Sequence, residues 1–394
     1  MTEVYIKWHS AIKEIKEEDW DLLINTDSSP FYSWHWLNAL EESDSISIKH
    51  GWQPLHLSCW RDGQAIAFAP LYLKNHSYGE FIFDQTFSQI ANEIGLRYYP
   101  KLIGMSPLSP ITGYRFFIRK GEDEKSITAM IIKTIDEFAI ENKILSCNFL
   151  YVDEEWGIVA ENCGCRKWIN KNSIWLAEDS KTFSDYLLKF NANQRRNIKR
   201  ERQSIEKLGI SITPLTSNEI DKKIILSMYN LYESHCSRWG PWGSKYLSKD
   251  FFHTLEKEKH KHKLILFSAH MGDPTNPIAM SMCIQNRHLL WGRYWGSHKE
   301  IDNLHFEICY YSPIEWGLKN GIRLFDPGAG GSHKQRRGFL ANPTASLHRW
   351  YNKDFDQYMQ VCLTKINKLV FNEINTTNKN MPYKVIKNSF LKQN

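Results

Sequence analysis

A weak internal repeat constrains the fold of this chain more than any other feature of its sequence. Residues 55–73 have the pattern strand, turn, strand, and Asp62-Gly63 is a typical hairpin turn. Residues 264–284 repeat this pattern around a longer polar turn. Each hairpin is preceded by a helical pattern and followed by a further helix and strand. The repeat predicts a duplicated α/β domain whose sheet is mixed, of the α+β kind.

The length of the chain agrees with two domains, because 394 residues exceed one ordinary hydrophobic core. We expect a first domain over residues 1–175, which closes with a helix near 123–142, and a second domain over 176–360. Residues 361–394 are expected to form a terminal helix and a basic, loosely ordered tail. This segment holds six lysines against one glutamate and accounts for most of the net charge of +6.

Composition bears on location and on metal chemistry. No stretch reaches the ~20 apolar residues that a membrane-spanning helix needs. The N-terminus lacks the apolar core of a signal peptide. We therefore expect a cytoplasmic protein without integral membrane association. The eight cysteines are scattered and do not have the spacing of a zinc site, so we expect reduced thiols and no metal.

Residues 193–208 have the pattern of a strongly basic helix. Five arginine or lysine side chains and one glutamate fall within residues 193–202. Arginine binds phosphate with a two-pronged fork, so this density favours a polyanion such as a pyrophosphate or an RNA backbone. The residues assigned to a phosphate-bearing donor are Arg195, Arg196, Lys199 and Arg200. The alternative is a solvated amphipathic helix with internal ion pairs.

A glycine-rich loop follows the predicted strand 323–326 and leads into a second basic cluster. Glycines let backbone N–H groups approach an anion. The loop matches neither a Walker motif nor a dinucleotide fingerprint, because His333 occupies the third glycine position of the latter. The residues assigned to the donor here are Gly330, Gly331, Lys334, Arg336 and Arg337. A plain connection between two strands is the alternative.

Titratable side chains gather where the predicted strand 289–295 runs into a helix over 303–320. Sites of α/β proteins lie at such strand ends. The candidates for a general acid or base are His305, Glu307, Tyr310 and His333. His305 and Glu307 are two positions apart on a helix, so they cannot face one target together. The candidates for substrate contact are Arg293, Tyr294 and Trp295.

Residues 312–315 introduce a conflict within this helix. Ser312-Pro313-Ile314-Glu315 has the pattern of a capping box with proline at the first helical position. Residues 303–311 also have a helical pattern. Either two helices meet here, or one helix kinks at Pro313.

Two loops of the first half combine aromatic and charged residues. They cover residues 74–84 and 96–101. The side chains assigned to substrate binding are Tyr78, Glu80, Tyr98, Tyr99 and Lys101. Surface loops stiffened by proline and aromatic residues are the alternative.

Several of these segments resemble one bacterial family of predicted N-acyltransferases. They lie in order across residues 30–350 and include Gly51-Trp-Gln-Pro, Leu96-Arg-Tyr-Tyr-Pro-Lys-Leu102, Arg196-Asn-Ile-Lys-Arg-Glu-Arg202, Gly292-Arg-Tyr-Trp-Gly296 and His305-Phe-Glu-Ile-Cys-Tyr-Tyr311. The family is labelled FemAB-like, or peptidoglycan biosynthesis/recognition. The resemblance implies two tandem GNAT-like acyltransferase domains.

The resemblance also implies kinship with Fem-type enzymes, which move an amino acid from aminoacyl-tRNA to an amine of a peptidoglycan precursor. Those enzymes carry segments similar to Arg196-Asn197 and to Lys334…Gly338-Phe339. The leading hypothesis is thus an N-acyltransferase with acyl-CoA or aminoacyl-tRNA as donor and a small-molecule or peptide amine as acceptor. The alternative is a non-catalytic module that binds a peptide or a glycan, with some of the 15 tryptophans stacking on sugar rings.

Overall fold

The computed structural model describes residues 4–24, 28–240, 244–257, 260 and 262–384. The chain divides into two compact units. Unit 1 comprises Met1–Asn170, Tyr246–Phe251 and Pro343–Phe371, and unit 2 comprises Lys171–Lys245, Phe252–Asn342 and Asn372–Asn394. Among the described residues, no helix is both long enough and apolar enough to cross a membrane.

The division differs from the expected boundaries near the C-terminus. The sequence placed residues 343–360 in the second domain, but these residues belong to unit 1. The reason is strand β15 (Leu340–Trp350), which pairs antiparallel with β8 (Ser146–Phe149) of unit 1. The expected terminal helix is α13 (Lys353–Lys379), and residues 385–394 of the expected loose tail lie outside the described residues.

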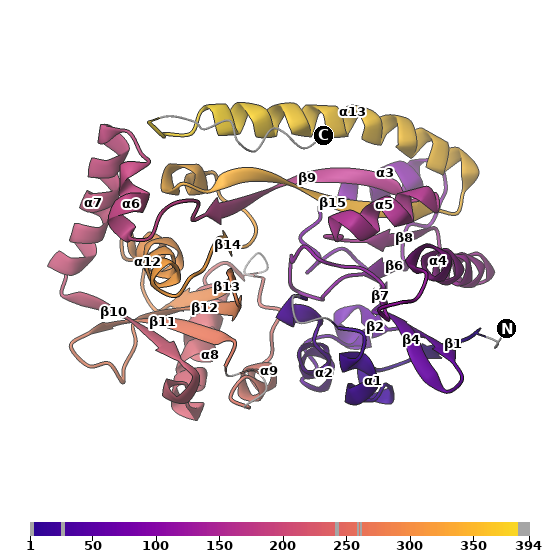
Figure 1. The fold of residues 1–394 in the computed structure, drawn as a ribbon, viewed down its shortest axis with the longest axis horizontal. Coiled ribbons are helices and arrows are strands. Elements are labelled where there is room, and N and C mark those ends of the chain that lie inside the picture. Colours follow the sequence, from indigo (N-terminus) through magenta and orange to yellow (C-terminus); the bar gives the residue numbers. More distant parts are fainter. Residues whose placement is uncertain (1–3, 25–27, 241–243, 258–259, 261, 385–394) are drawn as a thin grey trace. The chain divides into compact units, whose positions relative to one another are not determined.

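Unit 1 contains two sheets and several helices (Figure 1). One sheet has the order β1 (Val4–His9), β3 (His56–Arg61), β4 (Gln64–Ala69), β7 (Phe117–Ile118). The other strands of this unit run in the order β15, β8, β6 (Lys101–Gly104), β5 (Tyr72–Lys74), β2 (Trp52–Pro54). Its helices are α1 (Glu17–Asp21), α2 (Trp34–Glu42), α3 (Gln85–Glu93), α4 (Glu124–Glu141) and α5 (Glu154–Asn162).

The strands of unit 2 run in the order β10 (Ile210–Thr216), β11 (Leu264–Met271), β12 (Ala279–Asn286), β13 (Leu289–Ser297), β14 (Leu324–Asp326), β9 (Arg166–Leu176). Of β9, the residues from Lys171 onward belong to unit 2 and the earlier ones to unit 1. Neighbouring strands are antiparallel except for the parallel pair β13–β14. The helices of unit 2 are α6 (Phe183–Leu188), α7 (Ala192–Lys207), α8 (Lys222–Ser237), α11 (Leu304–Phe306) and α12 (Ser312–Lys319), and the unit boundary at Phe251 falls within α9 (Lys249–Thr254).

Both predicted hairpins are present. β3 pairs with β4, and β11 pairs with β12, each in antiparallel register. Asp62 and Gly63 have φ angles of 52° and 74°, the left-handed values that a tight two-residue turn needs. In unit 2 the hairpin is followed by β13, then by the helical segment 304–319, then by β14. This order of elements agrees with the expected mixed α/β fold.

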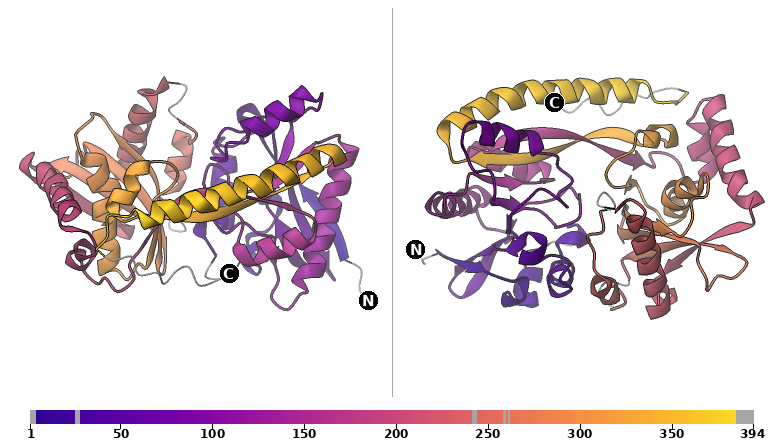
Figure 2. Two further views of the ribbon diagram at one scale, coloured as in Figure 1. Left: turned by 90° about the horizontal axis from the view of Figure 1, so that it is seen from above. Right: turned by 180° about the vertical axis from the view of Figure 1, so that it is seen from behind.

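Helices cover both faces of the unit 2 sheet. α8 packs across β12 and β13 on one face (Figures 1 and 2), where a Cβ on Gly296 would lie 2.2 Å from the backbone of Leu231. Ser281 of β12 points to the other face, because neighbouring side chains of a strand alternate and Met280 is the partner of Gly296. The Ser281 hydroxyl donates a hydrogen bond of 2.7 Å to the carbonyl of Ile308, which fixes the helical segment over that face.

The helical segment over residues 304–319 resolves the conflict in its sequence. α11 and α12 are joined by a π-helical turn, Glu307–Tyr311, and so form one run with an irregular middle. Pro313 lacks the N–H group that a regular α-helix needs at this point, and a wider turn accommodates that loss. Ser312 does not cap a new helix, because its hydroxyl donates to the carboxylate of Glu307 at 2.9 Å.

Candidate active site

Three of the four candidate acid or base residues lie together in unit 2. His305 is on α11, Tyr310 is on the π turn, and His333 is on a 3₁₀ helix, Ser332–Arg337. The ring centroid of His305 lies 5.2 Å from that of Tyr310 and 5.7 Å from that of His333. The Tyr310 hydroxyl lies 3.0 Å from His333 Nε2. We call His305, Tyr310 and His333 the imidazole–phenol cluster.

The π turn explains how His305 and Tyr310 meet. Residues five positions apart on an α-helix point roughly 140° away from each other, because each residue turns the helix by about 100°. A π turn bonds residue i to residue i+5 and adds one residue to the turn. It therefore places Tyr310 on the same side as His305. Trp295 of β13 packs on His305 from the sheet, with ring centroids 4.7 Å apart.

The surroundings keep this cluster uncharged near neutral pH. Burial lowers the pKa of His305 to about 3, and the neighbouring His333 and Arg337 act in the same direction. Burial also lowers the pKa of His333 to about 4, helped by the positive charges of Arg337 and Lys334. Burial raises the pKa of Tyr310 far above its ordinary value. The imidazoles are thus unprotonated near neutral pH, and the phenol keeps its proton.

Arg337 links the cluster to the basic helix α7. Its Nη1 donates to the His333 carbonyl at 2.9 Å, and its Nη2 donates to Glu201 of α7 at 2.8 Å. Its guanidinium carbon lies 3.3 Å from the ring centroid of Phe306. The hydroxyl of Tyr311 donates to the same Glu201 carboxylate. Arg337 was expected to bind the donor, but its buried side chain instead holds His333 in place.

The sequence did not single out Glu201. The feature that could have identified Glu201 is its negative charge, since it is the one acidic residue beside five basic residues in 193–202. A lone carboxylate in such a run lowers the repulsion along the helix, and it can also serve a buried partner elsewhere. Here the Glu201 carboxylate accepts hydrogen bonds from Arg337 and Tyr311.

Lys334 shapes the glycine-rich loop. Its Nζ donates to the carbonyls of Gly328 and Ala329 at 2.6 and 3.1 Å, and its side chain is buried. Burial lowers the pKa of Lys334 to about 8, against the opposing effect of Asp326. At Gly331, where φ is +84°, a Cβ would lie 2.4 Å from the His333 ring. The loop therefore needs glycine there to let the imidazole pack against its backbone.

Exposed basic groups lie beside this loop. Arg196, Lys199 and Arg200 on α7 are exposed, and so is Arg336 at the end of the 3₁₀ helix. The Gln194 side chain donates to the Arg336 carbonyl at 2.7 Å, so the start of α7 adjoins the end of the 3₁₀ helix. Arg195 is half-buried, and its guanidinium donates to the Phe190 carbonyl. Gly330 is exposed at the tip of the loop.

The remaining catalytic candidate, Glu307, lies apart from the cluster. Its buried carboxylate accepts hydrogen bonds from Arg202 of α7, of which the one from Nη2 measures 3.0 Å. This agrees with the expectation that His305 and Glu307 face different targets. Glu307 is therefore committed to an ion pair and is not placed to exchange protons with the cluster.

The substrate candidates on β13 have structural partners. Arg293 Nη2 donates to Asp326 at 2.9 Å, and its Nη1 donates to the Gly292 carbonyl at 2.7 Å. The β13–β14 ladder ends at Trp291 and Asp326, so this buried pair braces the strands where they part. The ring of Tyr294 packs on Tyr232 of α8. Trp295 of this strand contacts the cluster.

The substrate candidates of unit 1 form a buried network of their own. Lys101 Nζ donates to Glu80 and to Ser77 at 2.8 Å each, and also to Asp84. Tyr98 donates to Asp84 at 2.7 Å, and Tyr99 shares a hydrogen bond with Ser77. Glu80, Tyr98 and Lys101 are buried, whereas Tyr78 is exposed. Burial gives most of this set a structural role and leaves Tyr78 accessible.

Potential metal ligands do not gather in the part of the chain that the structure describes. No three histidine, cysteine or carboxylate side chains there are close enough to hold a metal ion. All eight cysteines are free thiols, as the scattered spacing predicted.

Solved structures with similar folds include FemX, with a TM-score of 0.50 and 12% identity, covering 91% of this chain and 100% of that one. Another is the C-terminal domain of a putative lysylphosphatidylglycerol synthetase from Agrobacterium fabrum, with a TM-score of 0.51 and 8% identity, covering 87% and 94%. A tandem GNAT protein from the clavulanic acid biosynthesis pathway matches at a TM-score of 0.47 and 9% identity, covering 89% and 99%. No match was found among curated protein sequences.

The element order and these likenesses define a protein of two tandem GNAT-like domains, as the sequence predicted. The chain belongs to the FemAB-like family, which is described as peptidoglycan biosynthesis/recognition and whose model matches residues 11–385. Family and fold together make it a transferase enzyme. This supports the leading hypothesis over a non-catalytic binding module.

Proposed function

We propose that this protein transfers an aminoacyl group from aminoacyl-tRNA to an amine. The family description, peptidoglycan biosynthesis/recognition, favours a peptidoglycan precursor as the molecule that carries this amine. The observation that carries the proposal is the exposed basic surface formed by Arg196, Lys199 and Arg200 of α7 with Arg336. This surface adjoins the segment that holds His333. It suits a donor whose phosphates are spread along a backbone.

A second feature favours tRNA over a donor with one compact pyrophosphate. A helix N-terminus binds pyrophosphate when its surroundings are neutral or basic. The start of α11 is preceded by the exposed residues Lys299, Glu300 and Asp302, which together carry a net negative charge. That end of the helix repels an anion more than it attracts one.

The cluster provides a route for the protons of the transfer. In the tautomer in which His333 Nε2 donates to Tyr310, Nδ1 is free to accept a proton from the attacking amine. The amine nitrogen bonds to the ester carbonyl carbon, and the bond from that carbon to the ribose oxygen breaks. Tyr310 gives its proton to the leaving oxygen and regains one from His333 across the 3.0 Å contact. The products are an amide and a free ribose hydroxyl.

The pH dependence follows from these assignments. His333 accepts a proton only when neutral, so activity is lost as the pH falls through about 4, the pKa to which burial lowers it. Burial lowers the pKa of Lys334 to about 8. As the pH rises through that value, its ammonium loses its charge and its hydrogen bonds to the loop carbonyls become weaker. Once the rates are corrected for the fraction of unprotonated amine acceptor, we expect kcat/KM to be flat between these limits. An acid limb near pH 6.5, with the fold intact by circular dichroism, would contradict the role given to His333.

Thermal shift with donors and donor analogues tests the proposed donor. Charged and uncharged tRNA should raise the melting temperature, and the shift should shrink as salt rises, because phosphate contacts release counterions. Acetyl-CoA and longer acyl-CoAs should leave it unchanged. Stabilisation by an acyl-CoA, with none by tRNA, would move the donor to acyl-CoA and overturn the proposal.

Two double variants locate the donor surface. Arg196→Ala with Arg200→Ala removes two exposed charges from α7 and should abolish most of the tRNA shift. Lys125→Ala with Lys133→Ala removes two exposed charges from α4 of unit 1 and serves as the matched control. Equal losses in both double variants would mean that tRNA responds to net charge alone.

A further inference from the structure

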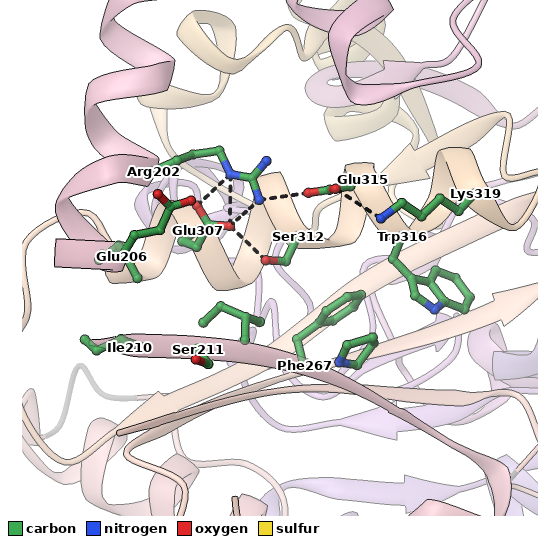
Figure 3. Close-up of a pocket in the computed structure, with 13 residues that line it drawn as sticks. Arg202, Glu206, Ile210, Ser211, Phe267, Glu307, Ser312, Glu315, Trp316 and Lys319 are labelled. Atoms are coloured by element: carbon green, nitrogen blue, oxygen red, sulfur yellow. Dashed lines mark hydrogen bonds and ion pairs between the residues drawn. The ribbon is translucent and has the colours of Figure 1, made fainter. Parts of the chain in front are cut away.

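A pocket of about 440 Å³ lies between α7, α12 and the edge of the unit 2 sheet. Figure 3 shows its two sides. Charged residues of α7 and of the helical segment 304–319 lie along one side, and Ile210, Ser211 and Phe267 of the sheet lie along the other. The ring of Trp316 extends from α12 toward the strands. A pocket of this size is large enough for a small organic molecule.

The charges of the pocket are almost fully paired with one another. Arg202 donates to Glu307 and, at 2.8 Å, to Glu315. Lys319 pairs with Glu315 at 3.1 Å. Glu206 is exposed on α7 at the rim, and no hydrogen bond or ion pair is found for its carboxylate among the described residues. Three negative and two positive side chains line the pocket, so its unbalanced charge is one carboxylate.

The opposite wall is apolar and aromatic. Ile205, Ile210 and Phe267 belong to the buried core of unit 2, and the pocket opens onto them. Phe267 and Trp316 meet edge to face, with ring centroids 6.3 Å apart. Apolar and aromatic walls of this kind accommodate the apolar frame of a small molecule. Apolar walls, an aromatic face and one unbalanced carboxylate together match an organic cation.

The pocket is distinct from the imidazole–phenol cluster. Glu307, Ser312 and Glu315 line the pocket, whereas His305 and Tyr310 of the same helical segment contact His333. The two sites use different sides of one helical segment. None of the three cluster residues lines the pocket.

We propose that this pocket binds a small organic cation with an apolar body, such as a primary ammonium on an aromatic or aliphatic frame. The apolar body occupies the space over Phe267 and Trp316, and the cation lies toward Glu206. The site goes beyond the proposed transfer reaction and does not depend on it.

Isothermal titration calorimetry with three matched probes tests the site. Tryptamine carries an ammonium at neutral pH, tryptophol is its neutral counterpart, and indole-3-acetate carries a negative charge. We expect tryptamine to bind about threefold more tightly than tryptophol, because an exposed ion pair contributes only modestly. Indole-3-acetate should bind most weakly. Equal affinities for the three probes, or no binding of any of them, would overturn the proposal.

Variants of the rim locate the binding. Glu206→Gln should remove most of the preference for tryptamine, and Glu206→Lys should turn it into a preference for indole-3-acetate. Glu141→Gln removes an exposed carboxylate from α4 of unit 1 and should change nothing. A cation preference that survives in both Glu206 variants would place the binding elsewhere. His333→Ala should leave tryptamine binding intact, which separates this site from the transfer reaction.

Discussion

A His333→Ala variant is expected to transfer the aminoacyl group ~10²–10⁴-fold more slowly than the parent enzyme, the range that a positioned acid or base contributes. Within the cluster, His333 Nε2 lies 3.0 Å from the Tyr310 hydroxyl. The alanine variant removes the acceptor for the amine proton and also the group that returns a proton to Tyr310. Tyr310→Phe leaves His333 as the acceptor of the amine proton and removes only the proton donor to the leaving oxygen, so its loss should be smaller.

Single-turnover rates with a charged donor and an amine acceptor measure this effect. The matched control is His298→Ala, which removes an exposed histidine outside the cluster. Thermal shift with tRNA should be the same for the parent and for His333→Ala, because the donor surface on α7 is untouched. A variant that keeps at least a third of the parent rate would show that His333 is not the proton acceptor. The proposal would then pass to His305, the other neutral imidazole of the cluster.

The fold was predictable where the turn residues and the spacing of apolar residues indicate the same structure. The Asp62-Gly63 turn, the two hairpins and the basic helix all follow from spacing and turn chemistry, and all are present. The discontinuous domain boundary was not predictable in the same way. β15 begins in unit 2, which runs to Asn342. Its pairing with β8 is the feature that assigns its residues from Pro343 onward to unit 1. Sequence spacing carries little information about which distant strand a strand pairs with.

The site was predictable in its residue types but not in its partners. His305, Tyr310 and His333 were singled out, and they meet. From the sequence, Arg337 was assigned to the donor as part of a basic cluster, and Arg293 was assigned to the substrate. Both are buried and paired, Arg337 with Glu201 and Arg293 with Asp326. A charged residue near a site is ambiguous until its burial is known, since a paired charge is structural and an exposed one is available.

Unit 1 offers the sharpest case of this ambiguity, and stability measurements can resolve it. We expect Lys101→Met to lower the free energy of unfolding by about 3–5 kcal/mol, the usual cost of leaving a buried charge without its partner. Lys101 is fully buried and compensates both Glu80 and Asp84. Glu80 Oε1 and Asp84 Oδ1 have no hydrogen-bond partner among the described residues, and the other buried lysine near them, Lys74, hydrogen-bonds with His76 and the Tyr78 carbonyl instead.

The loss of unfolding free energy in Lys101→Met should be smaller at low pH than at high pH. Burial already raises the pKa of Glu80 from 4.5 to about 7, and loss of the lysine raises it further. The unfolded carboxyl keeps its ordinary pKa in both proteins, so both gain stability as the pH falls, but the variant begins to gain at a higher pH because its folded pKa is higher. Urea unfolding should therefore show a smaller deficit at pH 5.5 than at pH 8.

Two further variants test this explanation. Lys133→Met removes an exposed lysine of α4 and should have little effect at either pH. Lys101→Met combined with Glu80→Gln and Asp84→Asn should regain part of the lost stability, because the buried negative charges are gone. If Lys101→Met is as stable as the parent but impairs turnover through KM alone, the lysine serves the substrate. The role that the sequence suggested for it would then replace the structural one.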